Sequence, residues 1–159
     1  MKGSGLARDG KQKKVLAVAS SGGHWIQLLR LREAFQGMEV VFVGTDRAYA
    51  VDVPDQRFLT IQDANRDRPL LMLKTMWQAF RILLAERPDV VISTGAAPGL
   101  FALLFGRLVG AKTIWIDSVA NGETLSMSGR LAGHVVGLWL TQWPEVAREK
   151  GPFYRGAVL

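Results

Sequence analysis

Largely apolar runs recur along the chain, and most of them are separated by segments with helical periodicity. Runs that are apolar throughout, rather than at alternate positions, are typical of strands buried on both faces of a parallel sheet. Strands are predicted on this basis over residues 15–19, 39–43, 57–61, 89–93, 112–116 and 135–140.

Helices are predicted over residues 25–35, 70–84 and 98–109. In the second, large apolar residues follow the i, i+3, i+4, i+7 rule of an amphipathic helix. We expect these residues to face the core: Leu73, Met76, Trp77, Phe80, Leu83 and Leu84. Lys74, Gln78 and Arg81 mark the opposite face. The helix carries more apolar side chains than one sheet face should absorb, so contact with lipid or with a partner protein stays open.

Alternation of strands and helices predicts an α/β fold with a doubly wound, mostly parallel sheet of the Rossmann-like type. The length of 159 residues suits one such domain. We expect a flexible basic tail over residues 1–13 and a single domain over residues 14–159.

Ligands of doubly wound sheets bind beyond the carboxyl ends of the strands. The glycine-rich and polar segments of this chain directly follow the predicted strands, at residues 20–24, 45–47, 62–68, 94–98, 117–121 and 142–145. This clustering predicts a ligand site at that rim of the sheet.

The most distinctive of these segments is Ser20, Ser21, Gly22 and Gly23, followed by His24 at the start of a predicted helix. The glycines have no Cβ, so backbone N–H groups can approach a bound anion closely. A histidine in the first helical turn lies at the positive end of the macrodipole, which disfavours its imidazolium form. A neutral imidazole there is suited to take a proton from an acceptor hydroxyl. The alternative is a histidine that only caps or packs.

Other polar residues at this rim also have two interpretations. Asp117 could orient an imidazole or bind a hydroxyl, or it could cap the following segment. Asn121 could bind a sugar hydroxyl or simply adopt a turn conformation. Thr94 and Gly95 precede a helix whose free N–H groups could bind an anion, or they form a structural turn. Arg66 could hold a phosphate or belong to a solvated loop.

The net charge of +6 and an isoelectric point near 10.1 favour an acidic partner. Nucleic acid, an anionic membrane surface and a diphosphate ligand are the candidates, beside a basic surface that only aids solubility. The arginines are scattered, and the sequence contains no zinc-finger or RNA-binding signature. We therefore expect no nucleic-acid partner.

Several motifs are absent from the sequence, and their absence argues against particular kinds of catalytic chemistry. The chain contains no cysteine, no P-loop and no Asp-x-Asp pair, and neither histidine has metal-ligand spacing. We expect no bound metal and no thiolate chemistry. The 20–24 loop also lacks the G-x-G-x-x-G pattern of dinucleotide folds, although Asp46 lies where such folds keep a ribose-binding acid. A stand-alone dinucleotide-binding enzyme therefore stays an alternative function.

Five motifs, taken together and in this order, resemble one family: SSGGH (20–24), STGAAP (93–98), WIDSVAN (115–121), LSMSGR (125–130) and TQWPE (141–145). The family is the membrane-recruiting subunit of the two-chain UDP-N-acetylglucosamine transferase of dolichol-linked oligosaccharide synthesis, with its bacterial exopolysaccharide counterparts. A more distant resemblance is to the single-chain enzyme that adds N-acetylglucosamine to the undecaprenyl-diphosphate intermediate of peptidoglycan. The resemblance extends over residues 14–159.

The resemblance implies an inverting, metal-independent glycosyltransferase of the two-domain GT-B type, divided between two polypeptides. This chain would be the N-terminal, acceptor-side half, and a partner subunit would bind the UDP-sugar, so no cofactor is expected. The acceptor would be a polyprenyl-diphosphate-linked sugar, with His24 and Asp117 as catalytic residues. Acceptor binding is assigned to Ser20, Ser21, Gly22, Gly23, Thr94, Gly95, Ala96, Ser118, Asn121 and Arg66.

The eukaryotic members of the family carry an N-terminal transmembrane helix, and no apolar stretch here reaches the ~20 residues that span a bilayer. We therefore expect a bacterial exopolysaccharide or capsule enzyme that associates peripherally with the cytoplasmic face of the cell membrane. Tyr154, Val158 and Leu159 in the C-terminal segment are expected to dock the partner subunit, unless that segment is a last edge strand. A non-catalytic adaptor remains a further alternative.

Overall fold

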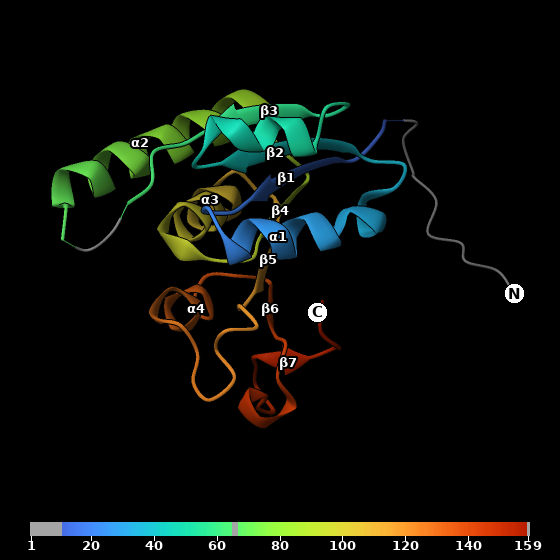
Figure 1. Ribbon diagram of the computed structural model, residues 1–159, viewed down its shortest axis with the longest axis vertical. Coiled ribbons are helices and arrows are strands. Elements are labelled where there is room, and N and C mark those ends of the chain that lie inside the picture. The colour runs from blue at the N-terminus through green and yellow to red at the C-terminus, as the bar shows by residue number, and fades with distance from the viewer. Residues whose placement is uncertain (1–10, 65–66, 159) are drawn as a thin grey trace, which may run out of the picture.

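A seven-stranded parallel sheet forms the centre of the molecule, in the order β3-β2-β1-β4-β5-β6-β7 (Figure 1). The computed structural model describes residues 11–64 and 67–158, so Arg66, Leu159 and most of the predicted tail lie outside the described residues. The strands are β1 (Lys14–Val18), β2 (Glu39–Gly44), β3 (Arg57–Thr60), β4 (Val90–Ser93), β5 (Lys112–Ile116), β6 (Leu138–Thr141) and β7 (Phe153–Tyr154). The strand order reverses between β1 and β4, which confirms the predicted doubly wound, Rossmann-like sheet.

The helices cover both faces of the sheet (Figure 1). They are α1 (Gly23–Arg30), α2 (Pro69–Glu86), α3 (Ala96–Leu108) and α4 (Met127–Ala132), with short 3₁₀ helices η1 (Arg32–Phe35), η2 (Arg47–Asp52) and η3 (Pro144–Val146). Successive residues of a strand point to opposite faces. Accordingly, Leu16 of β1 packs in the core with α2, α3 and α4, whereas Val15 packs in the core with α1 and η1.

Each predicted strand is present, and the largest boundary error is in the sixth. Residues 135 and 136 were predicted to begin it, but their N–H groups donate to the carbonyl of Ala132 in the turn that ends α4. The predicted helix over 25–35 is divided at Leu31, where the chain tightens into η1. The sequence pattern missed α4, η2 and η3, because each is too short for a periodic signal.

The predicted core stripe of α2 was wrong at several positions. Leu73, Trp77 and Leu84 are 56%, 59% and 47% exposed, whereas Thr75 and Ala79 are buried. Thr75 donates a hydrogen bond to the carbonyl of Gln62, and the Gln78 side chain accepts one from the Gln62 N–H, which fixes the rotation of the helix. The small buried residues allow α2 to lie close against α3, while Leu73, Trp77 and Leu84 face outward and Leu83 stays in the core.

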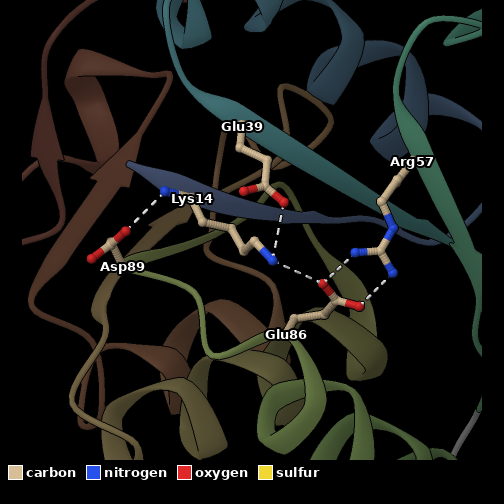
Figure 2. Close-up of polar contacts among 5 residues, drawn as sticks. All are labelled: Lys14, Glu39, Arg57, Glu86 and Asp89. Atoms are coloured by element: carbon tan, nitrogen blue, oxygen red, sulfur yellow. Dashed lines mark hydrogen bonds and ion pairs between the residues drawn. The ribbon is translucent and has the colours of Figure 1, made fainter. Parts of the chain in front are cut away.

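Ion pairs join the amino ends of the strands (Figure 2). Glu86, at the end of α2, accepts two hydrogen bonds of 2.8 Å from Arg57 and one of 3.3 Å from Lys14, whose ammonium also lies 3.0 Å from Glu39. The Asp89 carboxylate accepts the backbone N–H of Lys14 at 2.8 Å. We call Lys14, Glu39, Arg57, Glu86 and Asp89 the amino-end cluster.

These contacts shift the protonation equilibria of the amino-end cluster. Burial by itself would raise the pKa of Glu86, but the hydrogen bonds from Arg57 and Lys14 outweigh it and lower that pKa. The hydrogen bond to Glu39 raises the pKa of Lys14. The backbone N–H of Lys14 lowers the pKa of Asp89. Each shift favours the charged form, so the cluster stabilises the folded chain near neutral pH.

Candidate functional site

A pocket of about 360 Å³ lies at the carboxyl ends of the central strands, where the loops after β1, β4 and β5 meet. Among the residues assigned from the sequence, the structure brings five to its walls: Gly23, His24, Ala96, Ser118 and Asn121. Their positions in the chain are up to about a hundred residues apart. The parallel sheet therefore assembles the pocket, as the strand-end loops predicted.

Helix α1 begins at the glycine turn that follows β1. Gly22 precedes the helix with φ of 73° and supplies no side chain to cap it. Its own N–H donates to the Tyr49 hydroxyl at 2.9 Å, so this amide is not available to an anion. The first N–H groups of a helix have no intrahelical acceptor, and at α1 these belong to Gly23 and His24, which line the pocket.

The imidazole of His24 is held by the loop after β4. Its Nδ1 lies 3.0 Å from the carbonyl oxygen of Thr94, and the Thr94 hydroxyl donates to the carbonyl of His24 at 2.7 Å. A carbonyl oxygen only accepts hydrogen bonds, so Nδ1 carries the proton in this arrangement. In the neutral ring the other nitrogen, Nε2, is then free to accept a proton.

Gly95 makes this close approach possible. A Cβ built on it would overlap the His24 ring, and its φ of 155° is one that side-chain-bearing residues rarely adopt. Ala96, the first residue of α3, also lines the pocket. The second predicted loop therefore positions the histidine and also forms part of the pocket wall.

The buried carboxylate of Asp117 holds the loop that follows β5. It accepts hydrogen bonds from the Ser126 hydroxyl at 2.6 Å, the Ser126 N–H at 3.0 Å, Asn121 at 3.3 Å and the Trp115 indole at 3.2 Å. The Thr94 carbonyl holds Nδ1 of His24, and these four contacts of Asp117 are with other groups, which weighs against the alternative that Asp117 orients the imidazole. The alternative of a structural role accounts for these contacts, and a direct catalytic role stays a prediction.

Helix α4 supplies a wall of the pocket that the sequence did not assign. Ser126 caps this helix by accepting the N–H of Gly129 at 2.8 Å, and Ser126, Met127 and Ser128 line the pocket. The signal was present in the LSMSGR motif. We assigned no role to its residues, because serine and methionine by themselves do not indicate a functional site.

A buried pair of amides lies behind the pocket and joins four segments of the chain: α1, the loop after β5, the segment after β6 and the C-terminal segment. Gln27 of α1 donates to the Ser118 hydroxyl at 3.1 Å and accepts from Gln142 at 2.7 Å. Gln142 also donates to the Asp117 carbonyl at 3.0 Å and accepts the N–H of Val158 at 2.8 Å. We call Gln27 and Gln142 the amide pair. It connects the pocket loop to the C-terminal segment.

The remaining assigned residues lie outside the pocket lining. Ser20 is buried and Ser21 is exposed, and neither lines the pocket. In the C-terminal segment, β7 pairs with β6, so the edge-strand alternative is confirmed for Phe153 and Tyr154. Tyr154 is 40% exposed, and its predicted contact with a partner stays a prediction. Arg66 and Leu159 lie outside the described residues.

Asp46 does not resemble a ribose-binding acid in this structure. Its carboxylate accepts the N–H of Ala48 at 2.9 Å and thereby caps η2. This contact gives Asp46 a structural role and weakens the dinucleotide alternative.

The described part of the chain contains neither a metal-binding cluster nor a membrane-spanning helix. Within residues 11–64 and 67–158, no three His, Cys, Asp or Glu side chains are grouped so that they could hold a metal ion. No helix in the described part of the chain has the length and apolar character needed to cross a membrane.

Comparison with known proteins gives consistent matches. The family model "Oligosaccharide biosynthesis protein Alg14 like" matches residues 48–158. The UDP-N-acetylglucosamine transferase subunit ALG14 of Homo sapiens is 29% identical over 181 aligned residues, which cover 91% of this chain and 82% of the human protein. The corresponding subunit of Mus musculus is 28% identical and covers 92% of this chain and 83% of its own length.

Bacterial relatives match over part of their length. The UDP-N-acetylglucosamine–N-acetylmuramyl-(pentapeptide) pyrophosphoryl-undecaprenol N-acetylglucosamine transferase of Chlorobaculum parvum is 29% identical, covering 77% of this chain and 40% of that protein. The crystal structure of MurG from Acinetobacter baumannii aligns with a TM-score of 0.73 at 17% identity, covering 89% of this chain and 44% of that one. The chain thus spans less than half of these proteins.

The family model covers well over half of the sequence, and the resemblance carried by the five motifs is confirmed. The predicted glycosyltransferase assignment is confirmed by the same relatives, which are named as transferases or transferase subunits. The chain belongs to the Alg14-like family of oligosaccharide biosynthesis proteins.

Proposed function

We propose that this chain is the acceptor-binding subunit of a glycosyltransferase that acts on a lipid-diphosphate-linked sugar. A separate donor-binding subunit would hold the UDP-sugar. The observation that carries the proposal is the His24 ring, which lines the pocket with Nδ1 directed at the Thr94 carbonyl and Nε2 left as a proton acceptor. The names of the ALG14 relatives, which are subunits, support a two-chain enzyme.

In the proposed reaction, a hydroxyl oxygen of the acceptor sugar attacks the anomeric carbon of the UDP-sugar. The new C–O bond forms as the bond to the diphosphate breaks, and UDP departs with the bonding electrons. Nε2 of His24 takes the proton of the attacking hydroxyl, which makes the oxygen a better nucleophile. Attack opposite to the leaving group inverts the anomeric centre.

The diphosphate of the acceptor would bind at the helix starts that border the pocket. The first residues of both α1 and α3 line it, at Gly23, His24 and Ala96. Helix N-termini favour anions through their free N–H donors and through the macrodipole. Ser118 and Asn121 also line the pocket and would supply polar groups for sugar hydroxyls.

Transfer by a reconstituted complex tests this proposal. A donor-binding chain from the neighbouring reading frame would be co-expressed and co-purified with this subunit. Transfer would then be measured from UDP-N-acetylglucosamine, the donor that the relatives' names suggest, to a lipid-diphosphate-linked sugar. We expect transfer by the complex and none by either chain alone. Tight NAD binding by the isolated chain, without transfer by the complex, would instead support the dinucleotide alternative.

We also propose peripheral association with the cytoplasmic face of the membrane through the outer face of α2. Leu70, Leu73 and Trp77 are 80%, 56% and 59% exposed along this face. The exposed basic residues Lys74 and Arg81 flank them, and the chain carries a net charge of +6. Apolar side chains bordered by cations are suited to an anionic lipid surface.

Co-sedimentation with vesicles tests this face. Trp77→Ser should weaken binding to vesicles that contain anionic lipid, whereas Val51→Ser, at a residue 78% exposed on η2, should not. Equal binding of both variants would refute the assignment of α2. A role in exopolysaccharide or capsule synthesis stays a prediction, to be tested by the acceptor that the complex uses.

A further inference from the structure

A second hollow adjoins the His24 pocket. It is a groove of about 730 Å³ between the start of α2, one face of α3 and helix α4. Figure 1 shows α3 between the other two helices, which matches the groove's lining. Met72, Leu100, Phe101, Met127 and Leu131 form its apolar walls. Its volume lies within the roughly 300–1,000 Å³ typical of small-molecule sites.

The groove and the pocket share part of their lining. Ala96, Met127 and Ser128 line both of them, so α4 and the first residue of α3 form a shared boundary. The two hollows differ in character, because the pocket holds His24, Ser118 and Asn121 whereas the groove is mostly apolar. A single ligand that fills both must have a polar head and an apolar tail.

We propose that the groove binds the first isoprene units of the acceptor lipid, those next to the diphosphate. This inference rests on the proposed function and extends it to the lipid part of the substrate. Arg130 lines the groove on α4 and offers a cation near the place where the diphosphate would pass from the pocket into the groove.

The outer end of the groove leads toward exposed apolar surface. Leu131 lines the groove and is 50% exposed, and Leu70, on the first turn of α2 near Met72, is 80% exposed. An isoprenoid chain can therefore leave the groove beside the face of α2 proposed to contact the membrane. A protein segment is a poorer occupant, since it would share its walls with the pocket and obstruct the acceptor.

If the groove binds these isoprene units, the affinity for the acceptor should depend on them even in solution, where no membrane is present. Transfer by the co-purified complex would be measured, in the absence of vesicles, with two acceptors that carry the same sugar diphosphate. One has two isoprene units and the other a methyl group. We expect the isoprenyl acceptor to have a KM lower by about tenfold or more, because buried methylene groups contribute strongly in an apolar site.

Leu131→Asp is the variant that tests the groove, because it places a charge in the groove at a residue that does not line the pocket. It should raise the KM of the isoprenyl acceptor to about that of the methyl acceptor and leave kcat for the methyl acceptor unchanged. The matched control is Leu108→Asp, at a residue 74% exposed at the far end of α3, which should behave as wild type with both acceptors.

Direct binding gives a second readout that does not require transfer. Calorimetry on the same complex would compare geranyl diphosphate with inorganic pyrophosphate. Wild type should bind geranyl diphosphate more tightly, and Leu131→Asp should lose that preference. Equal affinities in the wild-type complex, or an equal loss with both acceptors in Leu131→Asp, would overturn the groove proposal. Failure of wild type to transfer to either acceptor, with the binding preference intact, would instead refute the proposed function.

Discussion

At the amino ends of the strands, charged side chains pair with one another, whereas at the carboxyl ends polar groups surround a pocket. The amino-end cluster joins the starts of β1, β2 and β3 to the end of α2 through Glu86 (Figure 2). At the opposite rim, Gly95 leaves space for the His24 ring, and Asn121 and Ser118 line the pocket. The two rims of the same sheet therefore differ: the charges of one are paired within the chain, and the polar groups of the other surround a pocket.

The contrast between the two rims separates the contacts that stabilise the fold from the surface that is open to a ligand. The carboxylates of the amino-end cluster find their partners within the chain, so their interactions contribute to folding. At the carboxyl-end rim, the internal contacts of Asp117 and the amide pair lie behind the pocket and hold its loops. We therefore expect substitutions at the two rims to separate effects on activity from effects on stability.

The largest effect is expected from His24→Ala. Loss of the proton acceptor should lower kcat by about 10²–10⁴-fold, the usual contribution of general-base catalysis. Binding of the donor subunit and the melting temperature should stay near wild type, as checked by co-purification and thermal unfolding. The matched control is His134→Ala, because His134 is exposed in the turn after α4. Turnover by His24→Ala at the wild-type rate would favour the non-catalytic adaptor.

Gly95→Ala should be the next most damaging change at the carboxyl-end rim. Its new Cβ would overlap the His24 ring and push it from the Thr94 carbonyl. A displacement of about 1 Å at a reacting group can cost about 10²-fold in rate, so we expect a loss of that order in kcat. Gly137→Ala is the control, since its Cβ would make ordinary contacts with Thr113, at 3.5 Å from the carbonyl and 3.9 Å from the hydroxyl. Equal kcat values for the two variants would contradict the role given to Gly95.

Gln142→Leu tests the link between the pocket and the C-terminal segment. It removes the acceptor of the Val158 N–H and the donor to Gln27, which leaves buried polar groups unpaired. We expect a loss of about 1–3 kcal/mol in the free energy of unfolding, measured with denaturant, and weaker binding of the donor subunit. Gln36→Leu, at an exposed residue that bonds only Glu33 through its side chain, should change neither quantity.

The smallest effect on activity is expected at the amino-end rim. Glu86→Gln weakens the contacts with Arg57 and Lys14 and should lower the free energy of unfolding by about 1 kcal/mol, because both partners are partly exposed. Transfer by the complex should remain at the wild-type rate. A large loss of kcat in Glu86→Gln would show that the two rims are not independent.

The pH dependence of stability gives a further check on the same variant. Because the pKa of Glu86 is lower in the folded chain than in the unfolded one, its stabilisation is present at neutral pH. That stabilisation should be lost as the pH falls below about 4.3, the ordinary value for glutamate, and through the folded pKa. Glu86→Gln should lack this part of the acid destabilisation. Identical acid profiles of wild type and Glu86→Gln would contradict the ion-pair assignment.

Much of the architecture was predictable because it depends on local patterns. The strands were found from apolar runs, and the loops that follow them were correctly expected at one rim, since parallel strands all end there. His24, Gly23 and Ala96 were placed near one another by that rule alone. The rotation of α2 was not predictable, since it depends on contacts of Thr75 and Gln78 with Gln62.

Polar side chains with ambiguous roles were the least predictable part of the site. From the sequence, Asp117 could take part in catalysis or hold the following loop, and the contacts with Ser126 and Asn121 that show the second role exist only in the folded chain. The amide pair gave no signal, because glutamine is common on surfaces and its burial depends on segments that are far apart in sequence. The Thr94 carbonyl is a backbone atom and has no sequence signature.

The sequence by itself determined the parallel sheet, the glycine loops at one rim and the family to which the chain belongs. These follow from periodicity, chain order and motifs, which are properties of neighbouring residues. Only the tertiary structure decided which nitrogen of His24 is held, which face of α2 is exposed and how the groove adjoins the pocket. Such features depend on distances between remote segments, and packing sets those distances once the whole chain has folded.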